Sequence, residues 1–205
     1  MASMKKFIAL LVVLVLLTGC AAGPRTVDLS ESFNKTNPLR IVERKRISAY
    51  KILNKSESTP NQSSGVFSTS YNGIGTAIKT KETVEEDLRN FINKSFEVDG
   101  TTDKVLIVTL LKADSYWVLD TLEKLPFVGL LTAAADREFG LNLRVRFEIE
   151  QSGKVVNSYL VDEKITVKAS AATDAALKDS YKKLISEYRA IFFPDLENNF
   201  VLRYF

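Results

Sequence analysis

The sequence predicts an α+β fold: a single domain with a mainly antiparallel sheet, a central buried strand, and two amphipathic helices packed on one side. Three patterns support this prediction. Residues 141–167 alternate apolar and polar positions on either side of a short polar turn, which is typical of a β-hairpin. Residues 105–111 are apolar almost throughout, as in a strand that is buried on both faces. Residues 84–96 and 177–192 carry apolar side chains at helical spacing.

The N-terminal residues have the pattern of an export signal. Lys5 and Lys6 precede an apolar run at residues 7–17, and small residues lead from this run to Cys20. A basic start, a short apolar run and a small-residue exit are typical of a secretory signal peptide. The run is shorter than the roughly 20 residues that a helix needs to cross a bilayer, so a transmembrane anchor is the weaker interpretation. We therefore expect residues 1–19 to be a signal peptide.

The end of this segment is more specific. Leu17-Thr18-Gly19-Cys20 resembles the lipobox of bacterial lipoproteins, in which cleavage precedes the cysteine and the cysteine is acylated. The resemblance implies a covalent lipid on Cys20 and attachment to a membrane through this lipid, with no other cofactor. Ala21 stands where an inner-membrane retention signal has Asp, which implies the outer membrane, with the domain facing the periplasm. An ordinary signal peptide with an incidental cysteine, or retention at the inner membrane, are the alternatives.

The composition argues against several classes of function. The formal charge is +3, and Lys5 and Lys6 belong to the predicted signal peptide, so the mature chain is nearly neutral and nucleic-acid binding has no support. Histidine is absent, and the single cysteine is the predicted lipid site. Without histidine or a free cysteine, the chain cannot form a zinc site of the usual nitrogen and sulfur ligands, a Ser-His-Asp triad or a Cys-His pair. We expect a protein that is not an enzyme and binds no metal.

Residues 20–39 contain Gly, Pro, Ser, Thr and Asn, which are typical of a tether between a lipid anchor and a domain. The periplasmic domain is then expected at residues 40–205, beginning with one or two strands at residues 40–53. The basic tripeptide Arg44-Lys45-Arg46 suggests either a contact with anionic lipid or a solvated strand face or turn. A loop at residues 54–64 and a loose strand or hairpin follow.

The first helix is predicted to begin at Thr83, because Thr83 and Glu86 have the spacing of a capping box. Asp99 and Gly100 mark its expected end. The apolar stripe that we expect to face the core consists of Val84, Leu88, Phe91, Ile92 and Phe96.

The central strand at residues 105–111 is followed by the least decided part of the chain. The strand has the composition to continue to residue 118, and residues 127–135 then follow Pro126 without a charge. As a loop, this run would expose an apolar patch of the kind that binds partners; as a helix, it would belong to the core. The candidate binding patch consists of Tyr116, Trp117, Phe127, Val128, Leu130 and Leu131.

The hairpin is predicted to turn through Gln151, Ser152 and Gly153, with Gly153 in the left-handed conformation. This loop would place Val145 opposite Tyr159, Leu143 opposite Val161, and Glu150 opposite Lys154.

The second helix is predicted at residues 171–193, capped by Thr173 or Ser170 and terminated by Pro194. The side chains that we expect on its buried face are Leu177, Tyr181, Leu184, Ile185, Tyr188 and Phe192.

A lipobox in front of this order of elements resembles the YajG-type family of envelope lipoproteins and the auxiliary lipoproteins of envelope lipid-transport systems. The resemblance is architectural, and it implies no catalytic residues. The preferred hypothesis is a non-enzymatic domain that binds an envelope protein partner or a lipid-like ligand. A structural subunit that forms an oligomer in a secretion or export assembly is the second hypothesis. A hydrolase is the third, and its candidate carboxylates are Asp114, Asp120, Glu123 and Asp136.

Overall fold

The computed structural model describes residues 43–56, 70–73, 77–119, 136–170 and 173–205. The lipobox and the predicted tether lie outside these residues, as does most of the undecided segment after the central strand. No helix in the described part of the chain is long and apolar enough to cross a membrane.

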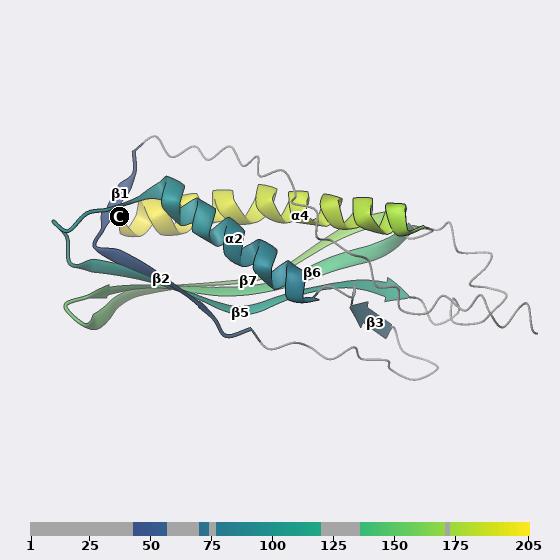
Figure 1. The fold of residues 1–205 in the computed structure, drawn as a ribbon, viewed down its shortest axis with the longest axis horizontal. Helices are drawn as coiled ribbons and strands as arrows, with labels where there is room; N and C mark the ends of the chain where they lie inside the picture. The colour runs from purple at the N-terminus through teal and green to yellow at the C-terminus, as the bar shows by residue number, and fades with distance from the viewer. Residues whose placement is uncertain (1–42, 57–69, 74–76, 120–135, 171–172) are drawn as a thin grey trace, which may run out of the picture.

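The main sheet has the strand order β2-β5-β6-β7, with β3 beside the far end of β5. The strands are β2 (Ala49–Asn54), β3 (Ser70–Gly73), β5 (Lys104–Leu119), β6 (Asp136–Gln151) and β7 (Lys154–Ser170). β5 pairs with β6 along nearly its whole length, with β2 in parallel and with β3 antiparallel (Figure 1). The central position of the predicted strand is therefore confirmed, because β5 has neighbours on both edges. Its burial on both faces is confirmed only in part, because Val105 and Ile107 are half-buried.

A second, two-stranded sheet joins β1 (Lys45–Ile47) in parallel to β4 (Phe96–Val98). Arg44 donates hydrogen bonds to the backbone carbonyls of Phe96, at 3.0 Å, and Asn93, at 3.1 Å. These carbonyls lie at the C-terminal end of the first long helix, α2 (Ala77–Ser95), where a positive charge is favoured. The first member of the basic tripeptide therefore caps this helix.

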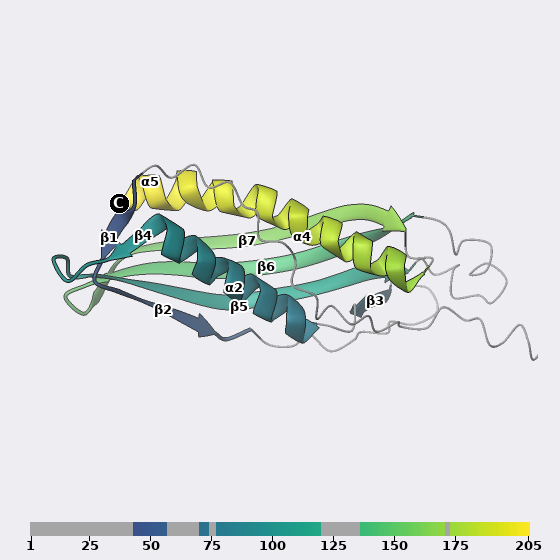
Figure 2. The ribbon, with the colours of Figure 1, turned by 45° about the horizontal axis from the view of Figure 1, so that its top comes forward.

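Two long helices cover one face of the main sheet: α2 (Ala77–Ser95) and α4 (Asp174–Leu196), the latter continued by η2 (Glu197–Val201) and α5 (Leu202–Tyr204) (Figure 2). α2 crosses β5, and α4 lies along β7 and β6. The predicted α+β fold, with both helices on one side, is confirmed.

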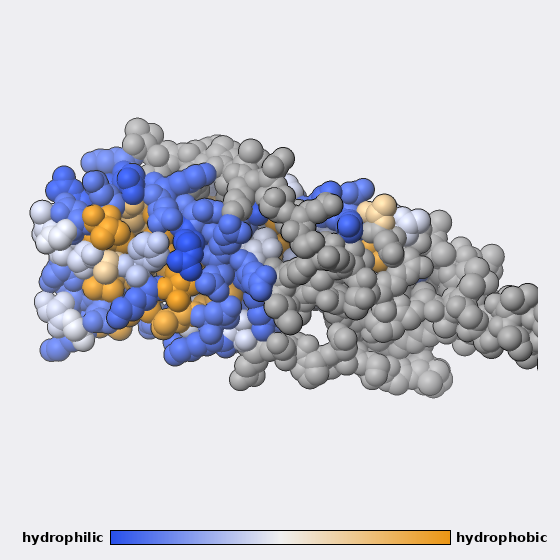
Figure 3. All heavy atoms as spheres, viewed as in Figure 1, coloured by the Kyte–Doolittle hydropathy of each residue, from blue (hydrophilic) through white to orange (hydrophobic). Residues whose placement is uncertain are grey.

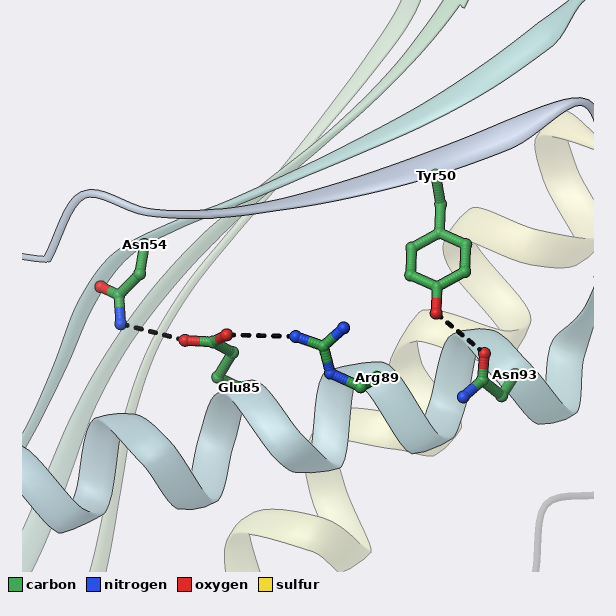
Figure 4. A network of polar contacts seen from close by, with 5 residues as sticks. All are labelled: Tyr50, Asn54, Glu85, Arg89 and Asn93. Carbon is green, nitrogen blue, oxygen red and sulfur yellow. Dashed lines mark hydrogen bonds and ion pairs between the residues drawn. The ribbon is translucent and has the colours of Figure 1, made fainter.

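The core between these two layers is built from the predicted stripes. All five residues of the first stripe and all six of the second are buried, and side chains of β5, β6 and β7 meet them. Polar contacts add to the packing of α2 on β2: the Tyr50 hydroxyl donates to Asn93 Oδ1 at 3.0 Å, and Asn54 Nδ2 donates to Glu85 Oε2 at 3.3 Å (Figure 4). Arg89 pairs with the same Glu85 along the helix.

Both ends of the first helix and the end of the second need correction. α2 ends at Ser95, directly before β4, and not at Asp99 and Gly100. α2 begins at Ala77 and not at Thr83, so the Thr83–Glu86 pattern lies inside the helix. A four-residue pattern of this kind is local, and it does not prevent the preceding residues from being helical. α4 begins as predicted, because Ala176 N donates to Thr173 Oγ1 at 3.1 Å. It then runs through Pro194 to Leu196, because proline removes one backbone donor but leaves the packed face of the helix in place.

The hairpin is present, but its predicted register is wrong by two residues. Ser152 and Gly153 form a two-residue turn, with φ of 51° and 77°, in place of the three-residue loop. Val145 is therefore opposite Val161. The register shifts by one residue between Ile149 and Glu150, and beyond this shift Gln151 pairs with Lys154 next to the turn. The remaining predicted partners are corrected to Phe147–Tyr159, Leu143–Glu163 and Glu150–Val155. A slip of two residues keeps every side chain on its predicted face, which is why the core residues were still assigned correctly.

Candidate functional site: the bare face of the sheet

The main sheet has one face that no described helix covers, and we call it the bare face. Along β6, residues at odd positions from 137 to 149 are buried beneath the helices, whereas Arg144 and Arg146 on the opposite side are exposed. In the two ribbon views, α2 and α4 lie together on the other side (Figures 1 and 2). A sheet in a two-layer domain buries one face and presents the other to solvent or to a partner.

The centre of the bare face consists of two neighbouring rows of side chains that run across four strands. The Arg146 row contains Leu53, Thr109, Arg146 and Leu160. The Glu148 row contains Lys51, Ile107, Glu148 and Ser158. Each row has one charged residue on β6, and the large apolar side chains Leu53 and Leu160 are 38% and 48% exposed. The face therefore combines exposed apolar surface with charges of both signs.

The charges at this centre have no counter-ion within the described part of the chain. No ion pair or hydrogen bond there involves the side chains of Arg146, Glu148 or Glu150. Arg144, one row further along β6, is different, because its Nε donates to Asp162 Oδ2 at 2.8 Å. The uncompensated charges leave this surface able to gain ion pairs with a molecule that covers it.

A second, more enclosed zone lies further along the same face. The ring of Tyr116 lies over Gly140, where a Cβ atom would come within 2.2 Å of the tyrosine ring. The Lys164 ammonium lies 5.8 Å from the centre of that ring and 3.7 Å from Glu138 Oε1. Asp114 is on the same face and is only 7% exposed. Glycine is required at position 140 because the aromatic ring occupies the space of any side chain.

Tyr116 and Trp117, the two described members of the predicted binding patch, lie on opposite faces of β5. Tyr116 is on the bare face, and Trp117 is in the core, where it is 1% exposed and stacks on Phe139. Arg137 also lies over the Trp117 ring, at 5.1 Å. The two residues therefore do not share one surface. Phe127, Val128, Leu130 and Leu131 lie outside the described residues, as does Cys20.

Polar residues between the two helices and the sheet form a further cluster, which the sequence did not indicate. The Thr80 hydroxyl lies 2.8 Å from Ser115 Oγ and 2.7 Å from the Tyr181 hydroxyl. Burial raises the pKa of Tyr181 to about 12. Arg189 on α4 makes two hydrogen bonds to Asp87 on α2. All of these side chains are buried, so they connect the layers and do not contact a ligand from solvent.

The candidate carboxylates of a hydrolase are not brought together. Asp114 faces Asn142, and Asp136 lies six residues further along β6, which corresponds to about 20 Å at the rise of a strand. Asp120 and Glu123 lie outside the described residues. Within the described ranges, no group of three His, Cys, Asp or Glu side chains has the arrangement of a metal site.

The chain matches no protein-family model, and no curated protein is similar to it in sequence. Among solved structures, it is similar to protein XCC0632 from Xanthomonas campestris, a member of the DUF330 family, at 13% sequence identity. The match covers 76% of this chain and 88% of that one, with a TM-score of 0.35.

Proposed function

We propose that this protein is a non-enzymatic lipoprotein of the bacterial outer membrane, of the YajG or transport-auxiliary type. A lipid on Cys20 anchors it, and its periplasmic domain uses the bare face to bind a protein partner in envelope transport or maintenance. The observation that carries this proposal is the contrast between the two sides of the sheet. The helix side is filled by large side chains, whereas the bare side presents exposed leucines beside unpaired charges.

A protein partner fits this face better than a lipid-like ligand does. An acyl chain laid across the Arg146 and Glu148 rows would remove water from both charges and offer no hydrogen bond in return, which is unfavourable. A protein surface supplies opposite charges together with apolar side chains. On the side of the molecule where α2 lies in front, blue hydrophilic residues stand between the orange apolar residues (Figure 3).

The anchoring part of the proposal is tested by changing Cys20 to Ser in the full chain. We expect the variant to escape lipidation and processing and to leave the outer-membrane fraction. Thr18→Ser is the matched control, since it alters the same segment but keeps a small residue before Gly19 and Cys20, and it should fractionate like the natural chain. If Cys20→Ser is still processed and remains with the outer membrane, the anchor is wrongly assigned.

The binding part is tested with a photo-crosslinking amino acid at one position at a time in intact cells. Ser158 lies on the bare face and Ser186 on the solvent side of α4, and both are exposed. Position 158 should yield a discrete crosslinked protein product and position 186 should not. Equal yields from the two positions would contradict the assignment of the bare face as the binding surface.

A further inference from the structure

The two central rows of the bare face are complementary to each other. They lie side by side, one with Arg146 and one with Glu148 on the same strand, and neither charge has a partner in the described part of the chain. We propose that the protein bound at this face is a second copy of the same chain. This inference rests on the proposed function, because it names the partner of the same surface.

A two-fold axis that crosses the strands between the two rows would make this contact self-complementary. Such an axis turns the second copy over and reverses its strand direction, so the Arg146 row of one copy covers the Glu148 row of the other. Arg146 then meets Glu148 of the second copy, and the reverse pair forms on the other side of the axis. Two ion pairs result from one pair of residues.

The next rows outward agree with this arrangement. Glu150 lies beyond Glu148 on β6, and Lys112 is paired with Arg144 on the row beyond Arg146. The same axis places Glu150 over Arg144 of the second copy, with Lys112 on the neighbouring strand. Within one chain, the carboxylates of Glu148 and Glu150 are neighbours on one face and repel each other. A second copy would replace this repulsion with attraction, because positive residues would cover both.

The apolar side chains are also matched across the axis. Ile107 of one copy covers Thr109 of the other, close to the axis on the central strand. Leu160 covers Ser158 at one edge, and Leu53 covers the carbon chain of Lys51 at the other. No large apolar side chain is placed directly over another one, so two sheets could approach to the usual spacing of about 10 Å.

The size of the contact suits a weak pair that is assisted by the membrane. Four strands about 4.8 Å apart and four rows about 6.8 Å apart cover roughly 500 Å² per copy, so the pair buries on the order of 1,000 Å². This area lies at the lower limit of specific interfaces. Lipid anchors that hold both copies on one membrane raise their effective concentration, which favours a weak contact.

The experiment uses the full chain in intact cells, with Ser158→Cys or Ser186→Cys and a short thiol-to-thiol crosslinker. Ser158 lies in the Glu148 row next to the axis, and Ser186 is the matched control on α4. We expect a product of twice the chain mass from Ser158→Cys, several-fold above the yield from Ser186→Cys. The natural chain, with Cys20 alone, measures the background.

Charge variants then test the pairing itself. Arg146→Glu in the Ser158→Cys chain should reduce the product to the control yield, because the new carboxylate would face the carboxylate of Glu148 in the second copy. Adding Glu148→Arg should restore the product, because the pair is reversed and not removed. A loss that the reversal does not restore would overturn the proposed geometry, as would equal yields from Ser158→Cys and Ser186→Cys.

The result also separates this inference from the proposed function. A product in which Ser158→Cys is joined to a different protein, with none of twice the chain mass, overturns the second copy but leaves partner binding at the bare face standing. The membrane fractionation of Cys20→Ser tests the lipid anchor, and its result does not depend on either crosslinking result.

Discussion

The buried ion pair between α2 and α4 allows a quantitative test of how the two helices are held together. Arg189 Nε donates to Asp87 Oδ2 at 2.8 Å, and a second nitrogen donates to Oδ1 at 2.9 Å. The side chains are only 10% and 6% exposed. Asp87→Ala would remove the carboxylate that accepts both of these hydrogen bonds from the buried guanidinium, and removing one member of such a pair typically costs about 3–5 kcal/mol. We expect a loss of unfolding free energy in this range.

The loss is measurable by urea denaturation, with fluorescence as the signal. Trp117 is the only tryptophan and is 1% exposed, so its emission reports on the core. Replacing both partners, as Asp87→Leu with Arg189→Met, should cost less than either single change, because no charge then remains buried.

The surface pair between Arg144 and Asp162 is the matched control. Both side chains are about half exposed, at 50% and 54%, and such pairs usually contribute less than about 1 kcal/mol. Arg144→Ala should therefore have a small effect. If Asp87→Ala costs no more than Arg144→Ala, or if the double replacement costs as much as the two single changes added together, the reasoning about buried charge is wrong.

Three other predictions concern single contacts. Gly140→Ala should destabilise the protein by about 1–3 kcal/mol in thermal unfolding, because the new Cβ overlaps the enclosed ring of Tyr116. Thr173→Ala should cost about 1 kcal/mol in the same assay, because Ala176 N loses its acceptor. The pKa of Tyr181 is raised from 10 to about 12, so the neutral phenol favours the folded state. That contribution is complete below pH 10 and is lost as the pH rises from 10 to 12, by about 3 kcal/mol. Tyr181→Phe should make alkaline unfolding less steep.

For each of these three predictions, a specific experimental result would contradict it. In a Tyr116→Ala background, Gly140→Ala should become nearly neutral, and an unchanged cost would show that the ring is not the obstacle. Thr173→Ser should keep the cap, so it should not reproduce the loss seen with Ala. If Tyr181→Phe loses stability between pH 10 and 12 as steeply as the natural chain, burial of this phenol does not control the alkaline transition.

Several elements were predictable because their signals are local. From residue 141 to residue 150 of β6 the odd positions are apolar and the even positions polar, so the two faces could be assigned without knowing what covers either. The stripes of α2 and α4 follow the helical period and were buried as expected. A cap at Thr173 or Ser170 was also predictable, because a cap involves residues only a few positions apart, and the structure shows Thr173 in this role.

The errors have three different causes. The hairpin slipped by two residues in the prediction because a three-residue loop and a two-residue turn with an irregularity satisfy the same alternation. α4 passes Pro194 because its apolar side continues to pack beyond that residue. Tyr116 and Trp117 were grouped as neighbours in sequence, although neighbours on a strand point to opposite faces.

The order of apolar and polar residues was thus enough to determine the two helices, the central strand, the hairpin and the composition of the core. The resemblance of residues 17–20 to a lipobox led us to expect a lipid anchor at Cys20. The folded arrangement was needed to bring Asp87 to Arg189 across 102 residues, and to place Arg146 and Glu148 on a face without a covering layer. The reason is physical: periodicity tells which side of an element is apolar, but which charges meet, and which face stays open, depends on how elements distant in sequence pack together.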